Sequence, residues 1–135
     1  MVHAEATLVV IEARRYECQE CGAVMMVVPR EILARMLFTG SAIALALALY
    51  GLEGRSARAI RAEVSPLREV GTPEGGWKTL HRWIARAPSL WTCIRATATG
   101  ASARMRAERA ASTLAAHGAG ESLVHAAFVG AVRAR

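Results

Sequence analysis

Two runs of apolar and β-branched residues near the start of the chain flank a short polar segment. The runs cover residues 7–15 (TLVVIEARR) and 23–28 (AVMMVV), and the sequence Cys-Gln-Glu-Cys-Gly lies between them. Such a pattern predicts a β-hairpin. Pro29 is expected to end the second strand because proline has no N–H to donate to a strand ladder.

From residue 30 onward the apolar positions recur at three- and four-residue spacings, which indicates helix. The first predicted helix has its apolar face at Ile32, Leu33, Met36 and Leu37. Thr39-Gly40-Ser41 would end it, with Ser41 as the N-cap of a helix over 42–50. The apolar run 42–52 is too short to span a bilayer, so it is predicted to be a buried core helix.

Three further predicted segments complete the middle of the chain. A short helix over 56–64 has Ala57, Ile60 and Val64 inward and stops at Ser65-Pro66. A Gly- and Pro-containing loop over 67–76 follows, and then an amphipathic helix over 77–87 that Pro88 closes. Another helix is predicted over 90–96.

The last part of the chain is rich in alanine and predicts two helices, over about 102–117 and 121–133. Their apolar faces are thin, so loose docking and dimerisation are both open as their roles. The whole pattern predicts a mainly α protein with a small N-terminal β-hairpin, a helical bundle and Ala-rich C-terminal helices. The expected units are 1–29, 30–98 and 99–135.

Charge and composition narrow the function. The chain has 17 Lys and Arg against 11 Asp and Glu, a net charge of +6, which favours a polyanionic partner such as nucleic acid. It contains no Asp and no Asn, so mechanisms that need either residue are excluded, and its four histidines share no metal-site spacing. We expect a protein that is not an enzyme. The chain has three cysteines and shows no signal-peptide pattern, so we expect the protein to lie in a bacterial cytoplasm without a membrane anchor.

The helix over 77–87 has the two faces expected of a helix that reads DNA. Leu80, Trp83, Ile84 and Ala87 share one side, and Lys78 and Arg82 lie opposite, flanked by His81 and Arg86. Arginine can contact guanine with two hydrogen bonds, and lysine and histidine reach bases or phosphates. In the preceding helix, a stripe of Arg55, Arg58 and Arg61 suits contacts with phosphates.

These two segments carry a family resemblance. LYGLEGRSARAIRAEVSP followed by WKTLHRWI resembles the helix-turn-helix of transposases and transposase-associated proteins of bacterial insertion elements, whose second helix has the pattern Thr-x-x-Arg-Trp. The resemblance covers residues 14–91. It implies that Lys78, Thr79, His81 and Arg82 face DNA, whereas Trp83 packs the helix onto its neighbours. No catalytic domain of such a transposase fits in this chain.

Cys18 and Cys21, with the glycine after them, are similar to the second half of the zinc ribbons that often precede such domains. A complete zinc site needs four ligands, and upstream the chain offers only His3 and glutamates. Three interpretations are open: a degraded ribbon without zinc, a zinc site completed by His3 or another chain, and a redox pair. Cys93 is expected to be a buried apolar residue.

The leading hypothesis is sequence-dependent binding of double-stranded DNA by a transposase-related accessory protein or regulator. Its partners would be DNA and, in some settings, a transposase or another protein subunit, with homo-oligomers also open. One alternative is a protein-interaction subunit whose helices dock a partner. Another is an inactive remnant of a mobile element.

Overall fold

The computed structural model describes residues 10–29, 32–33, 36, 38–65 and 77–134. Within them the chain is mainly helical with a small antiparallel hairpin at its N-terminal end, which confirms the predicted fold class. The elements in chain order are β1 (Arg14–Glu17), β2 (Val24–Val27), α1 (Gly40–Gly51), α2 (Ala57–Val64), α3 (Lys78–Leu90), α4 (Ala103–Ala116) and α5 (Leu123–Arg133). The predicted loop 67–76 lies outside the described residues.

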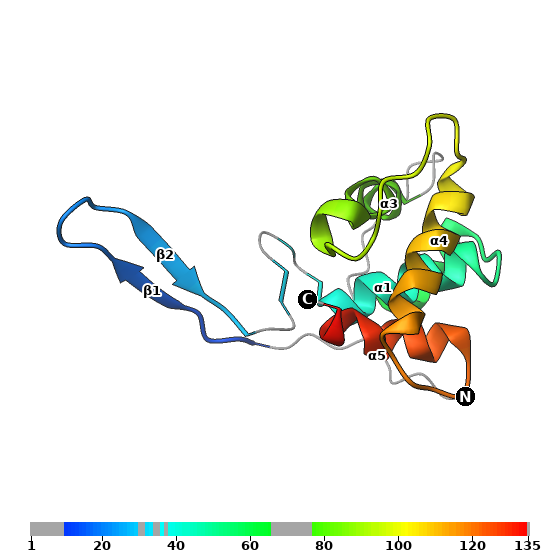
Figure 1. Ribbon diagram of the computed structural model, residues 1–135. Helices are drawn as coiled ribbons and strands as arrows, with labels where there is room; N and C mark the ends of the chain where they lie inside the picture. Colours follow the sequence, from blue (N-terminus) through cyan, green and yellow to red (C-terminus); the bar gives the residue numbers. More distant parts are fainter. Residues whose placement is uncertain (1–9, 30–31, 34–35, 37, 66–76, 135) are drawn as a thin grey trace.

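The hairpin pairs Arg14 with Val27 and Glu17 with Val24 in antiparallel register. Within the described residues its first strand starts later than predicted, because residues 10–13 form no strand; residues 7–9 lie outside the described part. Figure 1 shows β1 and β2 standing away from the helices. Every residue of both strands is exposed, including Met25 and Met26 at 64% and 63%. The hairpin is therefore held by its own ladder and turn.

Helix α1 is the centre of the bundle. Its Ala and Leu side chains over residues 44–49 are buried on every side of the helix, as expected for a helix that other helices cover on several sides. The predicted core role of the run 42–52 is confirmed, but the predicted cap is wrong. Thr39, not Ser41, is the N-cap: its Oγ1 accepts a hydrogen bond from the N–H of Ala42 at 3.2 Å. Over the described residues, no helix has the length and apolar character needed to cross a membrane.

The helix predicted from residue 30 is wrong for the residues that can be described. Ile32 forms an isolated antiparallel bridge with Thr39, and the N–H of Met36 donates to the carbonyl of Leu33 at 3.0 Å in a turn. Leu33 is buried at 2% exposure. A turn thus places the apolar side chains against the core without a helix. Leu37 lies outside the described residues.

Helix α2 agrees with its prediction. Ser56 caps it, with its Oγ accepting from the N–H of Ala59 at 3.2 Å, and Ser65 follows its last turn. Ile60 and Val64 are buried and Ala57 is partly buried. Serine at this position satisfies one of the N–H groups that a helix start leaves without a partner.

Helix α3 buries the four predicted side chains, Leu80, Trp83, Ile84 and Ala87. The prediction that the helix stops before Pro88 is wrong, because α3 continues to Leu90. Proline removes one hydrogen bond, yet the next turn still closes, since the N–H of Trp91 donates to the carbonyl of Ala87 at 3.1 Å. The helix predicted over 90–96 is also wrong: residues 91–98 form turns and irregular chain.

Helices α4 and α5 match their predicted positions, and serines cap both of them. Ser102 and Ser122 each accept a backbone N–H, from Met105 and His125. The two helices pack closely on each other and on α1, and this is the most extensive helix packing in the described chain. Gly51 marks the contact of α1 with α4, where an added Cβ would overlap the backbone of Glu108. Loose docking of these helices is therefore wrong.

Candidate nucleic-acid interface

The solvent face of α3 carries the cations that the sequence singled out. Lys78, Arg82 and Arg86 are exposed and follow each other at four-residue intervals, roughly 6 Å apart along the axis. None of the three forms an ion pair with a described residue, and α3 itself contains no acidic residue. The face thus presents a row of uncompensated positive charges.

An aromatic cluster beneath this face holds the first half of α3 in place. The ring of Trp83 packs edge-on against Phe38 at 4.9 Å and against Trp77 at 5.0 Å, measured between centroids. Phe38 directly precedes the cap of α1. The predicted packing role of Trp83 is confirmed, and this aromatic packing lies beneath the exposed cations of α3.

Two of the residues predicted to face DNA are less available than their spacing indicated. Thr79 is half-buried. His81 is exposed, but its ring lies edge-on to Tyr50 at 6.1 Å between centroids. Lys78 and Arg82 therefore dominate the N-terminal part of the face.

Tyr50 also brings in a cation that the sequence reasoning missed. The guanidinium carbon of Arg104 lies 4.6 Å from the centre of the Tyr50 ring, and its Nη1 donates to the Tyr50 carbonyl at 3.0 Å. Arg104 belongs to α4, so only the packing of α4 on α1 brings it to the same ring as His81. The sequence of α4 contains no DNA-binding motif that could have indicated where Arg104 lies.

The three arginines of the predicted stripe have different surroundings: Arg55 lies before the cap of α2, and Arg58 and Arg61 lie within the helix. Arg55 forms an ion pair with Glu63 between Nη1 and Oε2. Arg61 is half-buried, whereas Arg58 is exposed. A paired arginine gains less from a phosphate because its carboxylate partner must first be given up. Arg58 is thus the residue of the stripe best placed for a phosphate contact.

The hairpin turn that carries Cys18 and Cys21 is tight and hydrogen-bonded. The N–H of Gly22 donates to the Cys18 carbonyl at 2.8 Å, and Gly22 has a φ of 68°, which favours glycine. Hydrogen bonds to Cys18 from the backbone N–H of Cys21 and then of Glu20, with a smaller contribution from the Cys21 side chain, lower the pKa of the Cys18 thiol. Both cysteines are exposed.

These residues fit half of a zinc site. Cys18 and Cys21 would hold the ion as thiolates, and zinc bound there would join the two ends of the hairpin turn. Within the described residues no group of three or more potential metal ligands is found. His3, the one predicted further ligand, lies outside it. Cys93, which was expected to be buried, is partly exposed and borders a groove between α3 and α4.

The lowered pKa of Cys18 predicts faster alkylation in the folded protein. The thiolate is the reactive form, so a lower pKa leaves more of it at neutral pH, and the rate should persist to lower pH than in the unfolded chain. Iodoacetamide labelling across a pH series, read by peptide mass spectrometry, measures this. The same cysteine in urea is the reference, and Gly22→Ala, which strains the turn, should lose the acceleration. Equal pH profiles in the folded and urea-treated protein would contradict the hydrogen-bonded turn.

Comparison with known proteins gives no family or function for this chain. No protein-family model matches the chain, and neither a curated protein nor a solved structure matches it. The resemblance to transposase-associated helix-turn-helix segments therefore rests on the sequence pattern of residues 14–91.

Proposed function

We propose that this chain binds double-stranded DNA, with α3 as the element that enters the major groove. The observation that carries the proposal is the exposed row of Lys78, Arg82 and Arg86, unpaired among the described residues and supported by buried aromatic rings. The major groove is about 12 Å wide and admits one α-helix. Arg58 adds a candidate phosphate contact from α2.

The biological role that fits this proposal is an accessory protein or regulator related to insertion-element transposases. DNA binding of this kind takes place in the cytoplasm of a bacterium, where the chromosome lies. The exposed cations of α3 suit contacts with the phosphates and base edges of a duplex. We therefore propose recognition of DNA, not chemistry on DNA.

The test is a salt titration of duplex binding by fluorescence anisotropy, with a labelled duplex about two helical turns long. For the wild type, the logarithm of the affinity should fall steeply with the logarithm of salt concentration between about 50 and 200 mM. The triple variant Lys78→Gln, Arg82→Gln, Arg86→Gln should bind at least about tenfold more weakly. Its slope should be smaller by about 0.9 for each phosphate that the variant no longer neutralises.

Two single Arg→Gln variants, which remove the same charge at different places, distinguish an effect of position from an effect of net charge. Arg133→Gln removes an exposed cation at the end of α5, whereas Arg82→Gln removes one from α3. If the α3 face is the interface, Arg82→Gln weakens binding and Arg133→Gln leaves it nearly unchanged. Equal small effects of both variants would show that the duplex responds to net charge only, and the proposal would fail.

Sequence dependence needs a separate variant, because salt slopes report phosphates and not bases. Arg82→Lys keeps the charge but loses the planar pair of donors that can contact a guanine. On a duplex selected from a random pool, this variant should keep its salt slope and lose about 1 to 3 kcal/mol of discrimination against a changed base pair. Unchanged discrimination would assign the sequence preference to another residue.

One observation favours a second candidate function, docking to a protein partner. The hairpin exposes Tyr16, Val24, Met25, Met26 and Val27, each with 49% or more of its surface accessible. Aromatic and methionine side chains are enriched in protein interfaces. If duplex binding proves weak and insensitive to the α3 variants, this hairpin is the surface on which a partner should be sought.

A further inference from the structure

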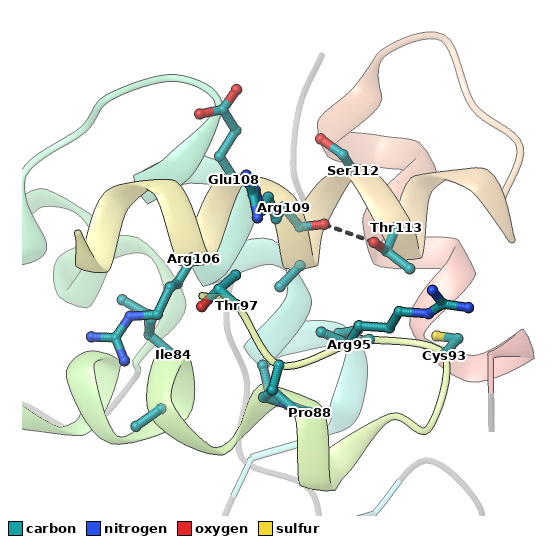
Figure 2. A pocket seen from close by; sticks show the side chains of 15 residues that line it. Ile84, Pro88, Cys93, Arg95, Thr97, Arg106, Glu108, Arg109, Ser112 and Thr113 are labelled. Carbon is teal, nitrogen blue, oxygen red and sulfur yellow. Dashed lines mark hydrogen bonds between the residues drawn. The ribbon is translucent and has the colours of Figure 1, made fainter. Parts of the chain in front are cut away.

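A groove separates the C-terminal half of α3 from α4, with the irregular segment 93–97 between them (Figure 2). Its volume is about 640 Å³, within the range of about 300 to 1,000 Å³ that is usual for ligand sites. Part of its lining is apolar and buried, from Ala87, Ile94 and Ala110. No pattern along the chain indicates this groove, because its walls come from segments that were expected to be separate.

Three arginines line this groove. Arg95 comes from the segment after α3, and Arg106 and Arg109 come from α4. Glu108 also borders it, but in Figure 2 its carboxylate points away from the arginine side chains across the groove. Figure 2 shows Arg106 toward one end of the groove and Arg95 toward the other. Arginine side chains therefore lie toward both ends of the groove.

Arg106 is the residue that indicates a ligand. Its side chain is only partly exposed, and its Nε is buried with no hydrogen-bond partner among the described residues. A buried N–H without an acceptor has lost its hydrogen bonds to water and gained none in exchange; in Arg106 this holds for Nε alone, because neither Nη is among the buried atoms without a partner. An anion brought to this wall would supply both the missing charge and the missing acceptors.

The polar groups around the arginines suit an anion with several oxygen atoms. Thr97 and Ser112 bring hydroxyl donors to the lining, while the Thr113 hydroxyl donates to the Arg109 carbonyl at 2.9 Å. Guanidinium groups match the oxygen geometry of phosphate and carry a permanent charge. Three of them in one groove exceed what a single carboxylate can neutralise.

We propose that this groove binds phosphate groups through arginines spread along it, with Arg106 toward one end, Arg95 toward the other, and Arg109 on α4. The phosphate belongs either to a DNA backbone or to a free phosphomonoester, and both sources share the same recognition. Ala85 lies on the exposed face of α3 and also lines the groove, so a duplex held by α3 passes close to it. The site does not depend on DNA binding by α3.

The test uses the full chain and follows the Nε–Hε resonances of its arginines by NMR. The Arg106 resonance is identified by its loss in Arg106→Lys. Titration with inorganic phosphate should shift the Arg106 resonance along a saturable curve and leave that of Arg133 unmoved. Sodium acetate and sodium chloride at equal ionic strength should not reproduce the shift. If acetate does reproduce it, or all arginines shift together without saturation, the proposal is overturned.

Variants assign the binding to the groove and identify the source of the phosphate. Arg106→Gln combined with Arg109→Gln should weaken phosphate binding at least about tenfold, and Arg95→Gln, an exposed position, gives a second reading should the double variant unfold. Saturation by a duplex identifies the DNA backbone, and saturation by a deoxynucleoside monophosphate alone identifies a free phosphomonoester. Lys78→Gln with Arg82→Gln should leave phosphate binding intact even if DNA binding by α3 fails. Unchanged phosphate binding in all groove variants would refute the site.

Discussion

Replacing Trp91 with alanine is expected to lower the free energy of unfolding by about 3 to 5 kcal/mol. Trp91 follows α3 directly, is fully buried, and donates from its Nε1 to the carbonyl of Ala131 at 2.9 Å. That carbonyl belongs to the last turn of α5, where carbonyl groups have no partner inside the helix. The indole therefore fills core volume and closes a helix end in one side chain.

A second substitution separates these two contributions. Trp91→Phe keeps most of the ring volume but removes the donor, so it should cost about 1 to 3 kcal/mol, the usual result of leaving a buried carbonyl without its partner. Urea unfolding followed by circular dichroism at 222 nm measures both variants on one scale, as is usual for helical proteins. If Trp91→Phe is as stable as the wild type, the hydrogen bond contributes nothing and the tryptophan acts by volume alone.

Gly130→Ala is expected to destabilise the protein by about 1 to 3 kcal/mol, opposite to the usual effect of this substitution in a helix. Inside a helix, alanine normally gains about 0.5 to 1 kcal/mol over glycine. At Gly130 an added Cβ would overlap the carbonyl oxygen of Leu114, which is backbone and has no rotamer to change. Helices α4 and α5 would have to move apart.

The matched control is a substitution to alanine on the exposed side of the same helix pair. Ser112→Ala lies on the solvent face of α4 and should change stability by about 0.5 kcal/mol or less. Thermal unfolding of Gly130→Ala, Ser112→Ala and the wild type gives the comparison. A rise in melting temperature for Gly130→Ala would show that α4 and α5 are not in backbone contact at this glycine.

Much of the secondary structure followed from local signals. Ser56 and Ser102 were readable as helix starts because a serine oxygen accepts an N–H of the first turn, wherever the helix then packs. The buried face of α3 was readable from the spacing of Leu80, Trp83, Ile84 and Ala87. The exposed position of Lys78 and Arg82 followed from the same spacing, since the opposite side of an amphipathic helix faces water.

The errors come from places where local and tertiary signals disagree. Residues 32 and 33 have helical spacing, but a bridge from Ile32 to Thr39 and burial of Leu33 use those side chains in a turn. Pro88 predicts a helix end, yet one missing hydrogen bond in the last turn is outweighed by the burial of Ala87 and Trp91 on either side. Thr39 replaced Ser41 as cap because both residues can accept an N–H and only packing chooses between them.

Local sequence was enough to assign most of the helices, the face of α3 that carries the cations, and the tight turn that Cys18 and Cys21 share. These properties depend on groups a few residues apart. Packing in three dimensions was needed to lay α4 and α5 over α1, to bring Arg104 to the Tyr50 ring that His81 also contacts, and to line one groove with three arginines. Alanine and glycine allow close approach without marking a partner, so periodicity shows that a residue is buried but not what buries it.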